Sequence, residues 1–485
     1  MKGIKMKKLI MSAMLVAASL ALATDRPNIV FIFIDDMGYG DIGPFGSENK
    51  TPHLDRMAEE GMKLTDFYVS STACTPSRSA LMTGCYADRV GMDGDVVFPG
   101  DPRGLNPSEI TIAEMLKARG YTTGCFGKWH LGDMPQFMPL KQGFDEYEGI
   151  PYSNDMWVLN PSTRAPGGFP PLPYMKQDKA VAHIPDAASQ ALLCEAVTDA
   201  AVGVIQRHRT EPFLAYVPYT YVHLPRLSRQ EWAQRAGGDE TRAQIEELDA
   251  GVGRILDTIR DLGIAEKTLV FFTSDNGPAR GCSAGPLRGA KSGPKYEGHM
   301  RMPTLAWWPG KIPDGMVCSE IGASIDILPT LAKITGAEVP SDRVIDGKDI
   351  SALLFEPGAK SPHSGLYYEY EGVRKGKWKL VRLGNAFKLY DLAADLGETK
   401  DLSAQYPEKV EELSTMLKAH EKKVAAARRP AGRAANSEPI LESPCKLPTL
   451  AEYLGQADIK AVGSVTKELS TEKNEKKKKK GKAGK

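Results

Sequence analysis

The sequence lacks several features that mark specialised classes of protein. Its 62 lysines and arginines are balanced by 61 aspartates and glutamates, so the net charge is only +1 and no overall field favours nucleic acid. Its 7 cysteines show no zinc-type spacing, and there is no internal repeat. Beyond the N-terminal region, no stretch is long and apolar enough to span a membrane. We therefore expect no nucleic-acid partner, no zinc finger, no repeat architecture and no integral membrane segment after the N-terminal region.

What is present is an ordinary globular composition, with 42% hydrophobic and 25% charged residues in a chain of 485. This length suits a large α/β enzyme with a smaller appendage. Unbroken apolar runs at 28–34 and 268–274 are typical of strands buried on both faces of a sheet. Helix and strand patterns alternate as far as residue 335. The sequence thus predicts an α/β fold with a large, mostly parallel sheet sandwiched by helices.

The pattern changes near Ser361-Pro362-His363. Short apolar stretches between 365 and 390 are separated by glycines and charged turns, and a helix pattern follows at 407–425. We expect a catalytic domain at 24–363 and a small C-terminal α+β subdomain with an antiparallel sheet at 364–428. Residues 429–485 are expected to form an extension that ends in a lysine-rich, disordered tail.

The N-terminus has the pattern of a secretory signal peptide at 1–23. Several lysines precede an apolar run at 9–23, which ends in the small-residue triplet Ala21-Leu22-Ala23. A membrane anchor is the alternative, but the run is short for a bilayer, which needs ~20 residues. No cysteine follows the triplet, which argues against a lipid anchor. We expect cleavage after Ala23 and a periplasmic or secreted protein, in which disulfides are permitted.

Each of the two buried runs stops at a pair of polar residues. Asp35-Asp36 follows the first run, and Asp275-Asn276 follows the second. Sites in open α/β sheets gather beyond the carboxyl ends of the strands, so both pairs are expected at one edge. Buried adjacent carboxylates need a cation, and their hard oxygens suit calcium or magnesium. The alternative is ordinary turn chemistry, because Asp, Asn and Gly commonly end strands.

The stretch from Cys74 to Gly84 is typical of a helix with a cysteine at its start. Pro76 suits the first turn, and Gly84 suits the end. Cys74 would lie at the positive end of the helix dipole, shortly before Arg78, and this placement favours a thiolate, an anionic ligand or both. A cysteine alone is equally well explained as a buried small hydrophobe or half of a disulfide.

Several motifs together resemble the type I, formylglycine-dependent sulfatases of the alkaline phosphatase-like superfamily. Cys-Thr-Pro-Ser-Arg at 74–78, followed by Thr-Gly at 83–84, resembles the signature in which the cysteine is oxidised to formylglycine. Gly-Lys-Trp-His-Leu-Gly at 127–132 resembles a second family motif, and 143–155 is similar to the arylsulfatase A branch. The resemblance extends from about Arg26 to Lys423.

This resemblance implies an exported sulfuric ester hydrolase and a role for each site residue. One calcium ion is expected to be held by Asp35, Asp36, Asp275, Asn276 and the modified residue formed from Cys74 (3-oxoalanine, or formylglycine). The implied catalytic residues are Cys74, Arg78, Lys128, His130 and His223. The implied substrate-binding residues are Lys128, Ser153, His223 and Lys291.

The family mechanism implies a formylglycine gem-diol as the nucleophile, one hydroxyl of which attacks sulfur while nearby cations neutralise the sulfuryl oxygens. His223 is expected to protonate the departing oxygen. His130 is expected to deprotonate the second hydroxyl, which expels sulfate and regenerates the aldehyde. Lys128 and His130 alternate on a segment expected to be extended, so that both face one pocket while Trp129 faces the core. A formylglycine-generating maturation enzyme is an implied partner.

Three features depart from the family pattern. One extra residue precedes Tyr296, which leaves Lys295 as a rival to Lys291 for the sulfate group. His299 stands where a small residue is more usual, and Cys85 stands where the family often has arginine. We expect these changes to alter local geometry and not the reaction.

Two other functions stay open at this point. A phosphate or phosphonate ester hydrolase can use the same scaffold, although a two-zinc phosphatase needs histidine ligands where this chain has Asp275-Asn276. A non-catalytic homologue that binds sulfated glycans would keep the pocket with Cys74 unmodified. The substrate, a sulfated small molecule or polysaccharide, is not specified by the residues at 157–174, which we expect to form a loop over the pocket mouth.

Overall fold

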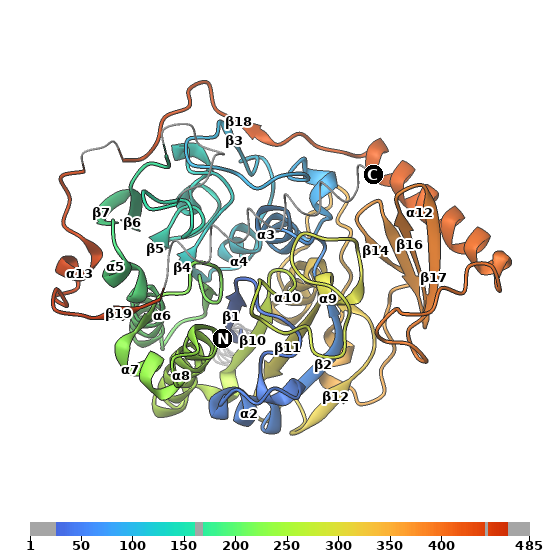
Figure 1. Cartoon of the computed structure of the whole chain (residues 1–485), viewed down its shortest axis with the longest axis horizontal. Coiled ribbons are helices and arrows are strands. Elements are labelled where there is room, and N and C mark those ends of the chain that lie inside the picture. Colours follow the sequence, from blue (N-terminus) through green and yellow to red (C-terminus); the bar gives the residue numbers. More distant parts are fainter. Residues whose placement is uncertain (1–25, 161–167, 442–444, 464–485) are drawn as a thin grey trace, which may run out of the picture.

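The computed structural model describes residues 26–160, 168–441 and 445–463, and Figure 1 shows how they are arranged. The expected signal peptide and the lysine-rich end of the chain lie outside these residues. Within them, the main sheet has the strand order β12-β2-β11-β10-β1-β8-β4-β5-β6-β7, and β13 also pairs with β2. Its strands are β1 Asn28–Ile34, β2 Met62–Tyr68, β4 Thr122–Lys128, β5 Glu146–Ile150, β6 Leu172–Lys176, β7 Lys179–Ile184, β8 Phe213–Pro218, β10 Thr268–Ser274, β11 Arg301–Trp307, β12 Met316–Cys318 and β13 Gly322–Ala323.

The centre of this sheet is parallel, as predicted. Strands β10, β1, β8, β4 and β5 run in one direction, whereas the outer pairs β10–β11, β11–β2, β5–β6 and β6–β7 are antiparallel. Strand β1 pairs with β10 from Asn28 opposite Thr268 to Ile34 opposite Ser274. These two strands therefore end side by side, at the same level of the sheet.

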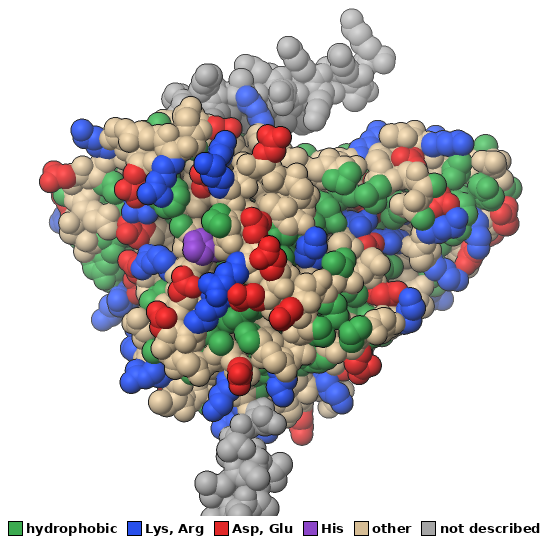
Figure 2. Space-filling view, turned by 90° about the horizontal axis from the view of Figure 1, so that it is seen from below, with side chains coloured by type: hydrophobic (Ala, Val, Ile, Leu, Met, Phe, Trp, Pro, Cys, Tyr) green, Lys and Arg blue, Asp and Glu red, His purple; other side chains and the backbone are tan. Residues whose placement is uncertain are grey.

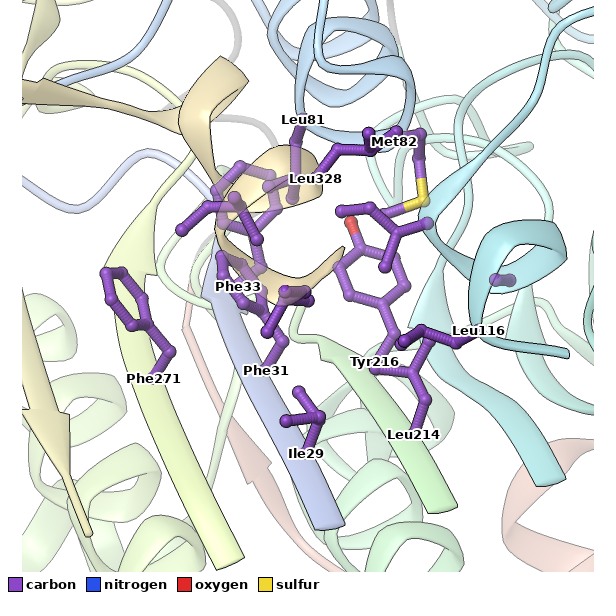
Figure 3. Packing of buried hydrophobic residues seen from close by; sticks show 14 of the residues in the cluster. Ile29, Phe31, Phe33, Leu81, Met82, Leu116, Leu214, Tyr216, Phe271 and Leu328 are labelled. Carbon is purple, nitrogen blue, oxygen red and sulfur yellow. The ribbon is translucent and has the colours of Figure 1, made fainter. Parts of the chain in front are cut away.

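Helices cover both faces of the sheet. Alternate residues of β1 face opposite layers, and every residue of the strand is buried. On one face, Leu81 of α3 and Leu328 of α10 pack with Phe31, Phe33 and Tyr216 (Figure 3). On the other face, α2, α6 and α8 contribute to a second apolar cluster. The helices of this domain are α2 Pro52–Glu59, α3 Cys74–Thr83, α4 Ile112–Ala118, α5 Ala187–Ala191, α6 Leu193–Arg207, α7 Gln230–Arg235, α8 Glu240–Asp261, α9 Glu297–Met300, α10 Ile327–Thr335 and α11 Ser351–Phe355.

A smaller antiparallel sheet with one packed helix follows, as the sequence predicts. Its order is β14-β15-β16-β17, with bounds Leu366–Tyr368, Gly372–Lys375, Trp378–Leu383 and Ala386–Asp391. Helix α12, Pro407–Ala426, places Leu413 and Leu417 against this sheet. Buried ion pairs join the sheet to the larger domain: Lys379 lies 2.9 Å from Glu297, and Arg374 lies 2.6 Å from Asp66.

The chain beyond α12, which the sequence predicts to be an extension, lies along the larger domain. Strand β18 (Gly432–Arg433) pairs with β3 (Arg103–Gly104), and β19 (Ala461–Val462) pairs with β9 (Ser228–Arg229). Between them, the short helix α13 (Leu450–Tyr453) buries Leu450 in an apolar cluster. In Figure 1 this segment crosses from the α12 side to the opposite side of the molecule. Backbone pairing holds it there, a contribution that composition does not reveal.

Lysine, arginine, aspartate and glutamate side chains are interspersed on the face seen in Figure 2. On α2 and α8, Arg56 and Arg260 pair with Glu60 at 2.6 and 2.7 Å. No helix in the described ranges combines the length and apolarity that crossing a bilayer requires. All 7 cysteines lie in described residues and are unpaired.

His420 of α12 predicts a pH-dependent stability. Its ring stacks on Tyr367 with centroids 3.7 Å apart, and burial lowers its pKa to about 4. Between pH 6.5 and 4 the unfolded chain therefore binds more protons at His420 than the folded chain does. The free energy of unfolding is highest above this pH range and falls as the pH is lowered through it. At pH 5 the expected loss is about 2 kcal/mol relative to pH 7.5. His420→Phe keeps the ring stack but cannot be protonated, so its free energy of unfolding should fall by about 2 kcal/mol less than that of the wild type between pH 7.5 and pH 5. Denaturant unfolding at both pH values measures this, and an equal fall in the two proteins would contradict it.

Candidate active site

The two polar pairs that follow β1 and β10 meet at the carboxyl edge of the sheet. The Asp36 backbone N–H donates to Asp275 Oδ1 at 3.1 Å, and Asn276 Nδ2 donates to Asp36 Oδ1 at 2.7 Å. Asp36 has φ 64°, a left-handed conformation that ends the strand and turns the chain over this edge. Asp35, Asp36, Asp275 and Asn276 are all fully or almost fully buried. The parallel register of β1 and β10 therefore places these polar groups in one buried cluster.

Helix α3 places Cys74 against this cluster. The helix begins at Cys74 after an extended residue and ends at Gly84, which has φ 67°, as the sequence predicts. Cys74 Sγ lies 3.4 Å from Asp35 Oδ1 and 3.4 Å from Lys291 Nζ. The helix start was expected to favour a thiolate, an anionic ligand or both; burial and the neighbouring Asp35 raise the pKa of the Cys74 thiol well above its ordinary value, which favours the neutral thiol.

Arg78, one turn further along α3, provides a buried positive charge beneath the cluster. Its Nε and Nη2 donate to Asp275 Oδ2 at 3.1 and 2.8 Å. Its Nη1 donates to the backbone carbonyl of Lys128 at 3.1 Å, and its Nη2 lies 3.4 Å from Asp35 Oδ1. Arg78 thus links the starting turn of α3 to the ends of β1, β4 and β10.

Lys128, the last residue of β4, supplies a second buried cation. Its Nζ donates to Asp35 Oδ2 at 2.6 Å and to Ser153 Oγ at 3.0 Å. Burial opposes ionisation of Asp35, but Lys128 and its cationic neighbours hold the pKa of that carboxyl well below its ordinary value. Burial and the proximity of Asp35 raise the pKa of Asp275 to about 6. The fixed cations therefore stabilise one carboxylate more than the other.

His130 lies near the cluster, but it is not on the same extended strand as Lys128, although the sequence predicted that it would be. Strand β4 ends at Lys128, and His130 has φ 61°, so the chain has already left the extended conformation. His130 Nε2 lies 3.0 Å from the Val97 carbonyl, while Trp129 is buried in the core as predicted. The Thr75 hydroxyl donates to the His130 carbonyl at 2.9 Å and accepts from the Val97 N–H at 3.1 Å.

Sequence reasoning missed these roles of Thr75 and Val97. The position of Thr75 directly after Cys74 was an available signal for the first. No local pattern marks Val97, because its contact with His130 spans 33 residues of chain.

Lys291 belongs to the cluster, whereas Lys295, the other candidate for binding the sulfate group, does not. Lys291 Nζ lies 2.8 Å from Asp36 Oδ1, whereas Lys295 Nζ lies 2.7 Å from Glu369 and 3.2 Å from Thr72 Oγ1. His223 joins from the loop after β8, with Nε2 3.5 Å from Asp36 Oδ2 and Nδ1 2.6 Å from the Leu224 carbonyl.

The cluster has donor atoms suited to a hard cation. Ligand atoms of Asp35, Asp36, Cys74 and His223 all lie within 4.8 Å of one another. Asn276 Oδ1 is buried and has no hydrogen-bond partner among the described residues. A buried acceptor without a donor is costly, and a metal ion would satisfy it. The oxygen-rich set around Asp36 therefore fits calcium or magnesium better than zinc.

The loop predicted at 157–174 is shorter than expected. Trp157 is fully buried in an apolar cluster, and β6 already begins at Leu172. Residues 161–167 of this segment lie outside the described residues, so its position over a pocket mouth stays a prediction.

Comparison with known proteins identifies the family. The sulfatase family profile matches residues 27–337, more than half of the chain. This protein is a member of the sulfatase family. A second profile, the C-terminal region of N-sulphoglucosamine sulphohydrolase, matches residues 294–427 of this sulfatase. The family assignment makes it a sulfuric ester hydrolase.

Curated and solved relatives agree with this assignment. The sulfatase is 42% identical to human arylsulfatase A over 400 residues, which cover 76% of this chain and 77% of that one. It is 36% identical to pig N-acetylgalactosamine-6-sulfatase over 369 residues, covering 71% and 69% of the two chains. Among solved structures, Ps i-CgsB in complex with k-i-k-neocarrahexaose superposes with a TM-score of 0.71 at 26% identity, covering 83% of this chain and 94% of that one.

Proposed function

We propose that this sulfatase hydrolyses aryl or carbohydrate sulfate esters with a formylglycine formed from Cys74 and one calcium ion. The observation that carries this proposal is the position of Cys74 Sγ, 3.4 Å from both Asp35 and Lys291, between acidic and cationic groups. The overall reaction breaks the ester S–O bond, consumes one water and releases an alcohol and sulfate. When present, formylglycine supplies an oxygen nucleophile in place of the thiol, and calcium supplies positive charge next to it.

The calcium ligands proposed are Asp35, Asp36, Asp275, Asn276 and the residue formed from Cys74. The buried, unpartnered Asn276 Oδ1 supports this assignment. Lys128, Arg78 and Lys291 lie around the same acidic groups, so the site as a whole is not excessively negative. This balance allows an anionic substrate to approach carboxylates that would otherwise repel it.

The substrate's sulfuryl oxygens are proposed to bind Lys128, Ser153 and Lys291. Lys128 and Ser153 are already hydrogen-bonded to each other at 3.0 Å and are buried, so they form a preorganised donor pair. Arg78 holds Asp275 and the Lys128 backbone in place beneath them. Charge that develops on the sulfuryl group is therefore met by donors that need no reorganisation.

His130 has the protonation state of a base. The Val97 carbonyl can only accept, so Nε2 carries the proton, and Nδ1 is a buried acceptor with no partner among the described residues. Burial and the nearby Lys128 and Arg78 lower the pKa of His130 well below its ordinary value, which keeps the ring neutral. We assign His130 the removal of a proton at the nucleophilic residue.

His223 has the opposite arrangement. Both ring nitrogens face oxygen acceptors, with Nδ1 2.6 Å from the Leu224 carbonyl and Nε2 3.5 Å from Asp36 Oδ2. We assign His223 the donation of a proton to the leaving oxygen and a place beside the bound sulfate ester.

The signal-peptide pattern at 1–23 supports export to the periplasm or the medium, and the motif at 74–78 supports a formylglycine-generating enzyme as partner.

Comparing matched aryl sulfate and aryl phosphate esters tests the reaction class. The protein should be purified from a host that matures Cys74, and the sulfate ester is expected to have the higher kcat/KM. Faster phosphate cleavage would contradict the proposal. A screen of sulfated mono- and polysaccharides with the same preparation then identifies the natural substrate class.

Calcium removal is expected to lower thermal stability as well as activity. At free calcium about 100 times the Kd, binding stabilises the folded state by about 3 kcal/mol, so chelation should lower the Tm and calcium should restore it. Asp36→Asn is expected to abolish this calcium-dependent shift. Asp41→Asn is the matched control, because buried Asp41 accepts from the backbone N–H groups of Gly38 and Ser283 and not from the cluster. A Tm shift that survives in Asp36→Asn would rule out the assigned ligands.

A further inference from the structure

The loop that carries Lys291 is wrapped around one buried imidazole. Residues 275–296 connect β10 to α9, and His299 of α9 is 3% exposed. A Cβ on Gly289 would lie 2.0 Å from His299 Nδ1, and a Cβ on Gly293 would lie 2.1 Å from His299 Nε2. These two glycines stand two residues before and two residues after Lys291. The loop therefore contacts both nitrogen edges of the ring with bare backbone.

Backbone hydrogen bonds also hold the loop at Lys291 itself and at nearby residues. The Lys291 N–H donates to the Pro278 carbonyl at 3.0 Å, and the Ser292 N–H donates to the Thr72 carbonyl at 3.2 Å. The Gly298 N–H donates to the Arg288 carbonyl at 2.7 Å. With its backbone held in this way, Lys291 reaches Asp36 and Cys74.

We propose that His299 is a positioning residue that sets the reach of Lys291 by filling the interior of its loop. Because the ring lies against the backbone at Gly289 and at Gly293, it occupies the interior of the loop on both sides of Lys291. Burial, with nearby Lys379, lowers the pKa of His299 to about 4, so the ring is an uncharged spacer near neutral pH. This inference rests on the role proposed above for Lys291.

The contact between Gly293 and His299 provides a compensating pair of substitutions. Gly293 does not have a positive φ, so alanine is compatible with its backbone, and the three nearest atoms that its Cβ would meet all belong to the His299 ring. Gly293→Ala is expected to push the loop from the ring and lower kcat/KM by about 10- to 100-fold, the scale of a small misplacement in an active site. His299→Ala is expected to lower it by about 10-fold, because the loop loses its support. The double variant should recover at least severalfold over Gly293→Ala; no recovery would overturn the inference.

A double-mutant cycle with Lys291→Ala separates positioning from general destabilisation. If His299 acts through Lys291, His299→Ala should cause little further loss of kcat/KM in the Lys291→Ala background. Losses that multiply would overturn the inference while leaving the role of Lys291 intact. A Lys291→Ala variant with unchanged kcat/KM would instead remove the proposed role of Lys291, and this inference with it. His420→Ala, which deletes another buried imidazole, is the control: it should lower the Tm and give the same fold-change in both backgrounds.

Discussion

Cys74→Ala is expected to abolish sulfate ester hydrolysis, with a fall in kcat of at least about 10⁴-fold, the scale seen when a nucleophile is removed. The physical reason is that the other side chains of the cluster that could attack sulfur are already bound by donors: Lys128 Nζ donates to Ser153 Oγ at 3.0 Å. Asp35 is bound by Lys128, and Asp36 is bound by Lys291 and Asn276. The loss should appear in kcat measured with a saturating aryl sulfate.

Cys194→Ala is the matched control for this substitution. Cys194 is as deeply buried as Cys74 but lies in α6, in the apolar layer behind the sheet. Its loss removes a similar side-chain volume and should leave kcat unchanged. Mass spectrometry of the peptide that contains Cys74 gives the second readout. Active protein whose residue 74 is entirely a free thiol would contradict the proposed nucleophile.

Arg78→Met is expected to reduce both stability and activity. It removes the partner of Asp275 from a fully buried ion pair, with N–O distances of 3.1 and 2.8 Å, and leaves the Lys128 carbonyl without its donor. Breaking such a pair from one side typically costs about 3–5 kcal/mol, because a buried charge is left uncompensated. The folded fraction should also lose at least about 100-fold in kcat, since the Arg78 charge contacts Asp275 and Asp35, which are proposed to surround the reacting groups.

Arg89→Met separates these two effects. Arg89 is also fully buried and also pairs with one carboxylate through two nitrogens, at 2.6 and 2.7 Å from Asp346. It lies after α3 and has no contact with Asp35 or Asp275 in the described structure. We expect a comparable fall in Tm with the kcat of the folded protein retained. Equal kcat losses in the two variants would show that Arg78 acts on stability alone.

Local patterns were sufficient to predict the scaffold of the site. The unbroken apolar runs at 28–34 and 268–274 predicted two strands buried on both faces, and the polar pairs that follow them predicted where those strands end. Because the strands are parallel, one rule about strand ends placed Asp35 and Asp275 together. Gly84 predicted the end of α3 in the same way, since only a left-handed residue closes the helix there.

Predictions failed where a side chain's surroundings come from distant segments. The helix position of Cys74 was expected to favour a thiolate, an anionic ligand or both, but burial and Asp35 raise the pKa of its thiol. His130 was expected to continue a strand alternation, but its φ of 61° and the Val97 carbonyl determine where its ring lies. Neither effect has a local signature.

The sequence by itself determined the sheet, the helix that begins at Cys74, and the acidic edge, because hydrophobic periodicity and end residues act over a few positions. Only the tertiary structure placed Lys291 inside the acidic cluster and Lys295 outside it, and brought the chain beyond α12 onto the larger domain. Those outcomes depend on packing and backbone pairing between segments far apart in the chain, such as the ring of His299 inside the Lys291 loop. Energies of that kind depend on the complete fold, so no short stretch of sequence contains them.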